Sequence, residues 1–132
     1  GLQQVSMNAT SFYGDIAYHD YEGPSLYLDE RDRLVESLDG KRAMILKNHG
    51  LMTVGKTVAA AFQRLYRLER ACQVQIDAGA AGELHVISDN VAAKSGADTN
   101  AFAESEDGYG FGELEYAALL RKIDRLDASY AS

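Results

Sequence analysis

The sequence AMILKNHGLMTVGKTVAAAFQRLYRLERACQVQ spans residues 43–75 and carries the strongest structural signals of the chain. Its first four residues, 43–46, form a short apolar run bounded by charged residues, which is typical of a buried strand. Residues 51–54 resume a β-type segment that closes at Gly55. Because only Asn48-His49-Gly50 and a lysine separate the two runs, the pattern predicts two strands joined by a short turn.

A long helix follows these strands. Thr57 is a good N-cap, and the helix is predicted to run to about Ala78, before a stop at Gly79. Its apolar residues recur at spacings of three and four and form one stripe: Val58, Phe62, Leu65, Leu68, Cys72 and Ile76. We expect this stripe to pack on a sheet or on another helix.

Working outward, the other predicted elements are shorter. They are a strand at 16–18, a helix over about 30–38, a short helix at 88–93 and a helix over about 113–127. The helix over 30–38 is predicted to be capped by Asp29 and to have Leu34, Val35 and Leu38 on its apolar face. The pattern in 1–14 does not separate helix from loop, and 96–112 is predicted to be the least ordered stretch.

Composition favours one folded unit over residues 1–132. Hydrophobic residues make up 46% of the chain and charged residues 25%, with a single proline, which is the balance of a packed protein. The net charge is −7, and residues 88–115 hold seven acidic residues and one lysine. Nucleic acid is therefore a poor partner, and the acidic stretch is interpreted as a solvated loop, or as a surface for a basic partner.

Compartment and membrane character also follow from composition. One cysteine, Cys72, excludes an intrachain disulfide and favours a reducing compartment. No apolar run approaches the roughly 20 residues of a membrane span, and the N-terminus lacks a signal-peptide pattern. We expect a cytoplasmic protein without a membrane partner.

Three histidines are candidates for chemistry: His19, His49 and His85. Alone they form no metal signature, because no His or Cys pair has ligand spacing. His49 stands out because it follows a predicted buried strand, where a rigid backbone can present the imidazole to a cleft. Gly50 is expected to permit the turn. A structural turn histidine is the alternative interpretation.

The stretch 43–75 resembles the class II aldolase/adducin family: a strand ending in Asn-His-Gly, a second strand ending in Gly, and a long helix containing Leu-Glu-Arg-Ala-Cys. DIAYHDYEG at 15–23 resembles the adducin-like branch, and LLRKIDRLDASY at 119–130 extends the similarity. The resemblance implies an α/β fold, a three-layer α/β/α sandwich with a mixed, largely antiparallel central sheet. It also implies that residues 1–132 are the C-terminal part of a single domain that is truncated at its N-terminus.

The resemblance implies a metal site. Family enzymes hold a divalent metal, expected to be zinc, through three histidines, and His49 matches the histidine of the Asn-His-Gly motif. The other two ligands form a His-x-His pair, and an acidic residue lies earlier still; this sequence has neither. Since zinc sites need three or four ligands, we expect the fragment itself to bind no metal and to be inactive.

The resemblance leaves two functions open. The first is a metal-dependent carbon–carbon lyase that acts on a small hydroxy-carbonyl or sugar-derived molecule, as a homo-oligomer expected to be a tetramer. The tyrosine that sugar-phosphate aldolases of the family use would fall near Gln3 to Val5, where no tyrosine occurs, which weakens that substrate class. The second is a non-catalytic, adducin-like interaction domain.

Other residues receive structural interpretations first. Cys72 is predicted to be a buried, unreactive thiol, and Glu69 a solvated or ion-paired carboxylate. His19, with Tyr18 or Tyr21, is a candidate to line the cleft of His49, although packing around a turn is the simpler role. No role is assigned to His85.

Overall fold

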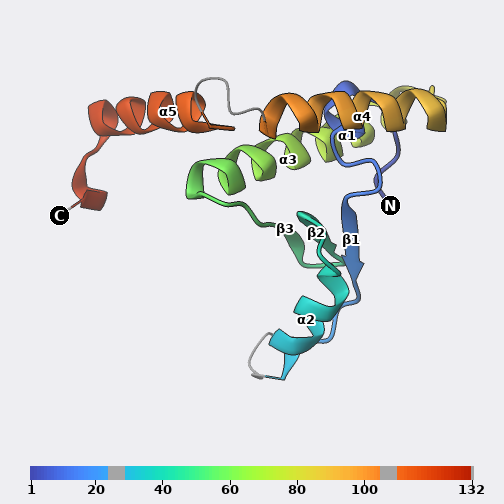
Figure 1. The fold of residues 1–132 in the computed structure, drawn as a ribbon, viewed down its shortest axis with the longest axis horizontal. Helices are drawn as coiled ribbons and strands as arrows, with labels where there is room; N and C mark the ends of the chain where they lie inside the picture. The colour runs from blue at the N-terminus through green and yellow to red at the C-terminus, as the bar shows by residue number, and fades with distance from the viewer. Residues whose placement is uncertain (24–28, 105–109, 132) are drawn as a thin grey trace.

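The computed structural model describes residues 1–23, 29–104 and 110–131. In chain order its elements are α1 (Met7–Thr10), β1 (Ile16–His19), α2 (Glu30–Leu38), β2 (Ala43–Leu46), β3 (Gly50–Thr53), α3 (Val58–Ala81), α4 (Asp89–Glu104), α5 (Glu113–Leu126) and the short 3-10 helix η1 (Ser129–Ala131). Figure 1 shows α2 below the sheet and α1, α3 and α4 above it, with α5 extending beyond the rest. None of the helices in these residues is long and apolar enough to cross a membrane.

The three strands form one mixed sheet in the order β1-β2-β3. β1 and β2 are parallel, with Ile16 opposite Ala43, and β2 and β3 are antiparallel, with Ala43 opposite Thr53. Parallel neighbours need a crossover connection, and α2 lies in that connection. The α/β fold with a mixed sheet, predicted from the sequence, is confirmed.

Helix α3 packs over the sheet and closes the core. Phe12, Ala43 and Leu68 form a buried cluster. The Thr57 hydroxyl accepts a hydrogen bond from the Ala60 amide, which confirms the predicted N-cap. The predicted stop at Gly79 is wrong, since α3 continues to Ala81: a glycine inside a helix costs only about 1 kcal/mol and does not end it.

The predicted apolar stripe of α3 is only partly buried. Leu68 is fully buried, but Val58 is 70% exposed and Ile76 is 66% exposed. The buried face instead includes Ala59 and Ala71, whose small side chains let the backbone of α3 approach its neighbours. The buried face of α3 therefore consists of Leu68 and these alanines rather than the whole predicted stripe.

Two further expectations are corrected. Helix α4 runs to Glu104, so residues 96–104 of the stretch predicted to be least ordered are helical, whereas 105–109 lie outside the described residues. A Cβ on Gly96 would lie 2.5 Å from the Thr10 carbonyl oxygen, so this glycine permits close contact between α4 and α1. Asp29 occupies the N-cap position of α2, but its side chain makes no capping hydrogen bond; its carboxylate instead accepts a hydrogen bond from Arg33.

The apolar face predicted for α2 is also only partly buried. Val35 is 67% exposed, and α2 contains no fully buried residue. Helix α2 therefore contacts β1 but buries none of its own residues completely.

Candidate functional site

His49 lies in the tight turn that joins β2 to β3. Its amide donates a hydrogen bond to the Leu46 carbonyl at 3.0 Å, which closes the turn. Asn48 takes a positive φ of 58°, a conformation that Asn adopts more readily than most residues. The His49 side chain is exposed. The hairpin thus holds the imidazole at the end of the sheet, outside the core.

The expected role of Gly50 in the turn is wrong. The positive φ falls on Asn48, and a Cβ on Gly50 would meet no atom within 4 Å. The described part of the chain therefore gives no steric reason for glycine at this position.

A small cavity of about 20 Å³ lies beside His49. It forms where β1 and β2 end, because the paired residues His19 and Leu46 are the last of these parallel strands. It is lined by His19, Asp20, Tyr21, Glu22, Glu30, Leu34, Leu46, Lys47 and His49. The structure thus brings His19 and Tyr21 to the cavity of His49. Tyr18 is not part of its lining, and its hydroxyl accepts a hydrogen bond from the Leu2 amide at 2.9 Å.

His19 is the buried histidine of this cavity, with only 7% of its surface exposed. Its Nδ1 lies 2.9 Å from the Ser37 hydroxyl, which fixes the ring against α2. Its Nε2 is buried and has no hydrogen-bond partner within the described residues; the Glu22 Oε1 atom is 3.9 Å away. Ser37 was not anticipated from the sequence, since a serine inside a helix gives no signal of a tertiary contact.

Charged pairs surround the cavity. Arg33 binds the Glu22 carboxylate at 2.6 Å and that of Asp29 at 2.9 Å, and these bonds raise the pKa of the Arg33 guanidinium. Lys47 binds the Asp20 carboxylate, and this hydrogen bond holds the pKa of Asp20 below its ordinary value. The Asp20 carboxylate is therefore charged at neutral pH.

His49 is the residue that the family resemblance marks as a metal ligand. An exposed, neutral imidazole suits zinc and similar divalent metals. However, no three His, Cys, Asp or Glu side chains in residues 1–23, 29–104 and 110–131 are grouped closely enough to hold a metal ion. A site at His49 therefore needs further ligands from outside these residues.

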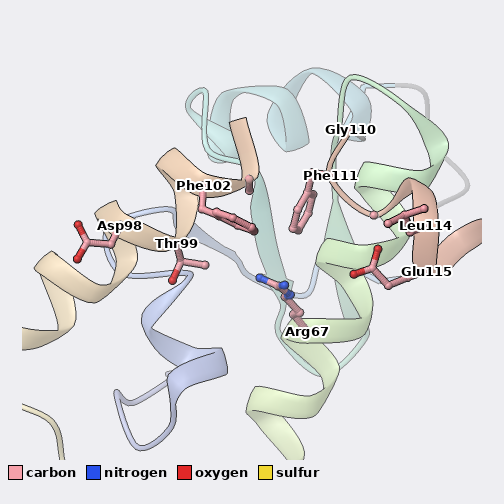
Figure 2. A pocket seen from close by; sticks show the side chains of 10 residues that line it. Arg67, Asp98, Thr99, Phe102, Gly110, Phe111, Leu114 and Glu115 are labelled. Atoms are coloured by element: carbon pink, nitrogen blue, oxygen red, sulfur yellow. The ribbon is translucent and has the colours of Figure 1, made fainter. Parts of the chain in front are cut away.

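Larger cavities lie elsewhere in the described residues. One of about 540 Å³ lies between α3, the end of α4 and the start of α5. Figure 2 shows Phe102 and Phe111 on either side of it, with the Arg67 side chain below them. The Phe111 ring centroid is 5.1 Å from the Arg67 guanidinium carbon and 5.6 Å from that of Arg64, so this residue anchors α5 to α3. The lining contains no histidine or cysteine, so we place the candidate site at His49.

The remaining candidates have ordinary surroundings. Glu69 binds Arg70 at 2.8 Å, as an exposed ion pair. Cys72 is half-buried, and burial, followed by the nearby Glu69 carboxylate, raises the pKa of its thiol. Since the thiolate is the reactive form, this agrees with an unreactive cysteine. His85 is exposed, between α3 and α4.

Comparisons with known proteins identify relatives of this chain. Residues 1–76 match the family described as Class II Aldolase and Adducin N-terminal domain. A protein of Caulobacter vibrioides that is named for aldolase class 2 is 37% identical over 99% of this chain and 50% of its own length. Human gamma-adducin is 33% identical over 96% of this chain and 19% of its own length.

Solved structures of class II aldolase proteins have a fold similar to that of this chain. The crystal structure of an aldolase II superfamily protein from Pseudomonas syringae superimposes with a TM-score of 0.85 and 39% identity, covering 100% of this chain and 52% of that one. L-fuculose 1-phosphate aldolase from Glaciozyma antarctica PI12 gives a TM-score of 0.71 and 30% identity, over 96% of this chain and 45% of that one. The chain spans about half the length of these aldolase relatives. From its sequence and its fold, the chain belongs to the class II aldolase and adducin family.

Proposed function

We propose that this chain is the C-terminal part of the domain of a metal-dependent, class II aldolase-like enzyme, and that it supplies one metal ligand, His49. The observation that carries the proposal is the exposed imidazole on a hydrogen-bonded turn at the end of the sheet, beside a cavity lined by carboxylates. Relatives named as aldolases support the reaction class. The substrate class is a small hydroxy-carbonyl or sugar-derived molecule.

The role of this chain in such a site is to position a ligand. The closed turn at Leu46–His49 limits the motion of the imidazole, so little order has to be gained when a metal binds. A bound divalent metal, zinc in this proposal, supplies a Lewis acid beside the negative charge that develops when a carbon–carbon bond breaks. A ring nitrogen of His49 would hold this metal, because imidazole nitrogen is a common zinc ligand.

Elemental analysis of the complete protein that contains this chain tests the proposal. The wild type should carry about one zinc per subunit, as expected of a single site. His49→Ala should lose it, because removing one of three ligands leaves too few. His85→Ala, a change at another exposed histidine, is the matched control and should keep it. Absence of metal from the wild type, or its retention in His49→Ala, would contradict the proposal.

A non-catalytic, adducin-like interaction domain is the second candidate. The observation that favours it is the 33% identity to human gamma-adducin over 96% of the chain. This candidate predicts a metal-free wild-type protein and a fold that His49→Ala leaves unchanged. The sequence of the complete protein separates the two further, because a His-x-His pair outside this chain supports the enzyme and its absence supports the interaction domain.

We also propose that the complete protein is a cytoplasmic homo-oligomer. The proposal is supported by membership of the family, whose enzymes are expected to be tetramers. Light scattering of the complete protein measures the number of subunits directly, and a monomer would contradict this part of the proposal.

A further inference from the structure

The two ring nitrogens of His19 have different surroundings. Nδ1 lies 2.9 Å from the Ser37 hydroxyl, whereas Nε2 is buried and has no hydrogen-bond partner in the described parts of the chain. The whole residue is only 7% exposed, so bulk water does not satisfy Nε2. A buried polar atom without a partner is costly, and such atoms in native proteins call for an explanation, for example a ligand or an ordered water.

The carboxylate of Glu22 does not supply the missing bond. Its Oε2 atom is bound by Arg33 at 2.6 Å, and its Oε1 atom lies 3.9 Å from Nε2, which is too long for a hydrogen bond. A polar separation of this length is one that a water molecule can bridge. Glu22, His19 and His49 all line the same cavity, so an atom that binds Nε2 there also lies beside His49.

The size of the cavity limits what it holds. At about 20 Å³ it exceeds the roughly 10–15 Å³ that a single water needs, and it is too small for a whole substrate. Its lining offers donors and acceptors from His19, Glu22 and Lys47, so the site is polar enough to retain a water. One oxygen atom is therefore the occupant that fits.

We propose that His19 is a substrate-binding residue of the His49 site, and that its Nε2 hydrogen-bonds one oxygen atom in the shared cavity. In the resting protein this atom is an ordered water; in the complex it is a hydroxyl or carbonyl oxygen of a small hydroxy-carbonyl molecule, which displaces that water. The inference rests on the proposed function for its substrate class, but the water does not depend on a metal. Ser37 holds the ring in place through Nδ1.

The alternative is a purely structural histidine that joins β1 to α2. In that case the bond between Nδ1 and Ser37 is the whole function, and Nε2 binds another protein group in the complete protein. Two substitutions separate the roles. An asparagine amide reaches the position of Nδ1 and can keep the Ser37 bond, whereas a glutamine amide reaches the position of Nε2 and can keep the bond in the cavity.

The first measurement is a high-resolution crystal structure of the complete wild-type protein. We expect a water or a small-molecule oxygen within hydrogen-bond distance of His19 Nε2, in the cavity beside His49. The proposal is overturned if Nε2 binds a protein group instead, or if the cavity is empty or filled by a side chain. This measurement decides the proposal even where a variant fails to fold.

The second measurement is calorimetric titration of the complete protein with glycolate, a stable probe with a hydroxyl and a carboxylate on adjacent carbons. His19→Gln should bind it within about twofold of the wild type, and His19→Asn about tenfold more weakly, as expected for one lost hydrogen bond. The opposite order, equal affinities in both variants, or no glycolate binding by the wild type would overturn the substrate-binding role.

Failure of this inference and failure of the proposed function give different results. If His49→Ala loses the metal and Nε2 of His19 binds a protein group, the substrate-binding role of His19 is rejected and the metal site is kept. A metal-free wild type with an oxygen atom at Nε2 rejects the metal site and keeps the cavity as a binding site.

Discussion

At the scale of single residues, Ser37 is the position on which the orientation of His19 depends. Ser37→Ala removes the partner of Nδ1 and leaves this nitrogen unsatisfied on a buried ring. We expect the free energy of unfolding to fall by about 1–3 kcal/mol, the usual cost of leaving a buried polar atom unpaired. Urea unfolding measures this, with Glu36→Ala on the exposed surface of the same helix as control. Equal stability of the two variants would show that the Ser37 contact contributes little.

Lys47, in the hairpin, and Asp20, directly after β1, form an ion pair. This pair predicts how stability depends on pH. The hydrogen bond from Lys47 holds the pKa of the Asp20 carboxyl below its ordinary value. A lowered pKa favours the folded state above the unfolded value, and this contribution is lost as pH falls through the folded pKa. Lys47→Met should raise the pKa of Asp20, measured by NMR titration of its carboxyl carbon, whereas Lys56→Met should leave it unchanged. An unaltered pKa in Lys47→Met would contradict the contact.

At the scale of elements, the hairpin between β2 and β3 depends on Asn48. Its φ of 58° is unfavourable for residues with a Cβ and accessible to glycine. Asn48→Ala should therefore destabilise the protein by about 1 kcal/mol, and Asn48→Gly should be nearly neutral. Thermal unfolding of the two variants provides the comparison. If alanine were tolerated as well as glycine, the turn would have another conformation and the placement of His49 would be in doubt.

Two glycines that lie inside helices, Gly79 and Gly96, predict opposite effects of the same substitution to alanine. Around Gly79 in α3 an added Cβ would meet no atom within 4 Å, so Gly79→Ala should stabilise the protein by about 0.5–1 kcal/mol. Around Gly96 in α4 the same atom would lie 2.5 Å from the Thr10 carbonyl oxygen, so Gly96→Ala should destabilise it. Chemical denaturation of both variants tests this, and a change of the same sign in both would contradict the packing of α4 on α1.

The same elements show how far sequence predicts this structure. Periodicity and capping placed β2 and α3 well, because a short apolar run and a capped long helix are local signals. The length of α4 was missed, since its glycine and polar residues suit a loop until α1 packs beside it. The sequence singled out His49, but it could not show that Nε2 of His19 lacks a partner, because that depends on contacts between β1, α2 and the segment after β1.

At the scale of the whole molecule, the candidate site and a much larger cavity occupy different regions. The His49 cavity lies where β1 and β2 end, next to α2, while the cavity around Phe111 lies between α3, α4 and α5. The chain also spans about half the length of its aldolase relatives. A metal site at His49 therefore needs further ligands from outside the described residues, and its decisive test belongs to the complete protein.

The most direct test is X-ray diffraction from crystals of the complete protein at the zinc absorption edge. We predict an anomalous peak about 2.0–2.1 Å from a ring nitrogen of His49, the usual distance for zinc and imidazole. A well-ordered His49 with no metal at that distance would contradict the claim that this histidine is a ligand.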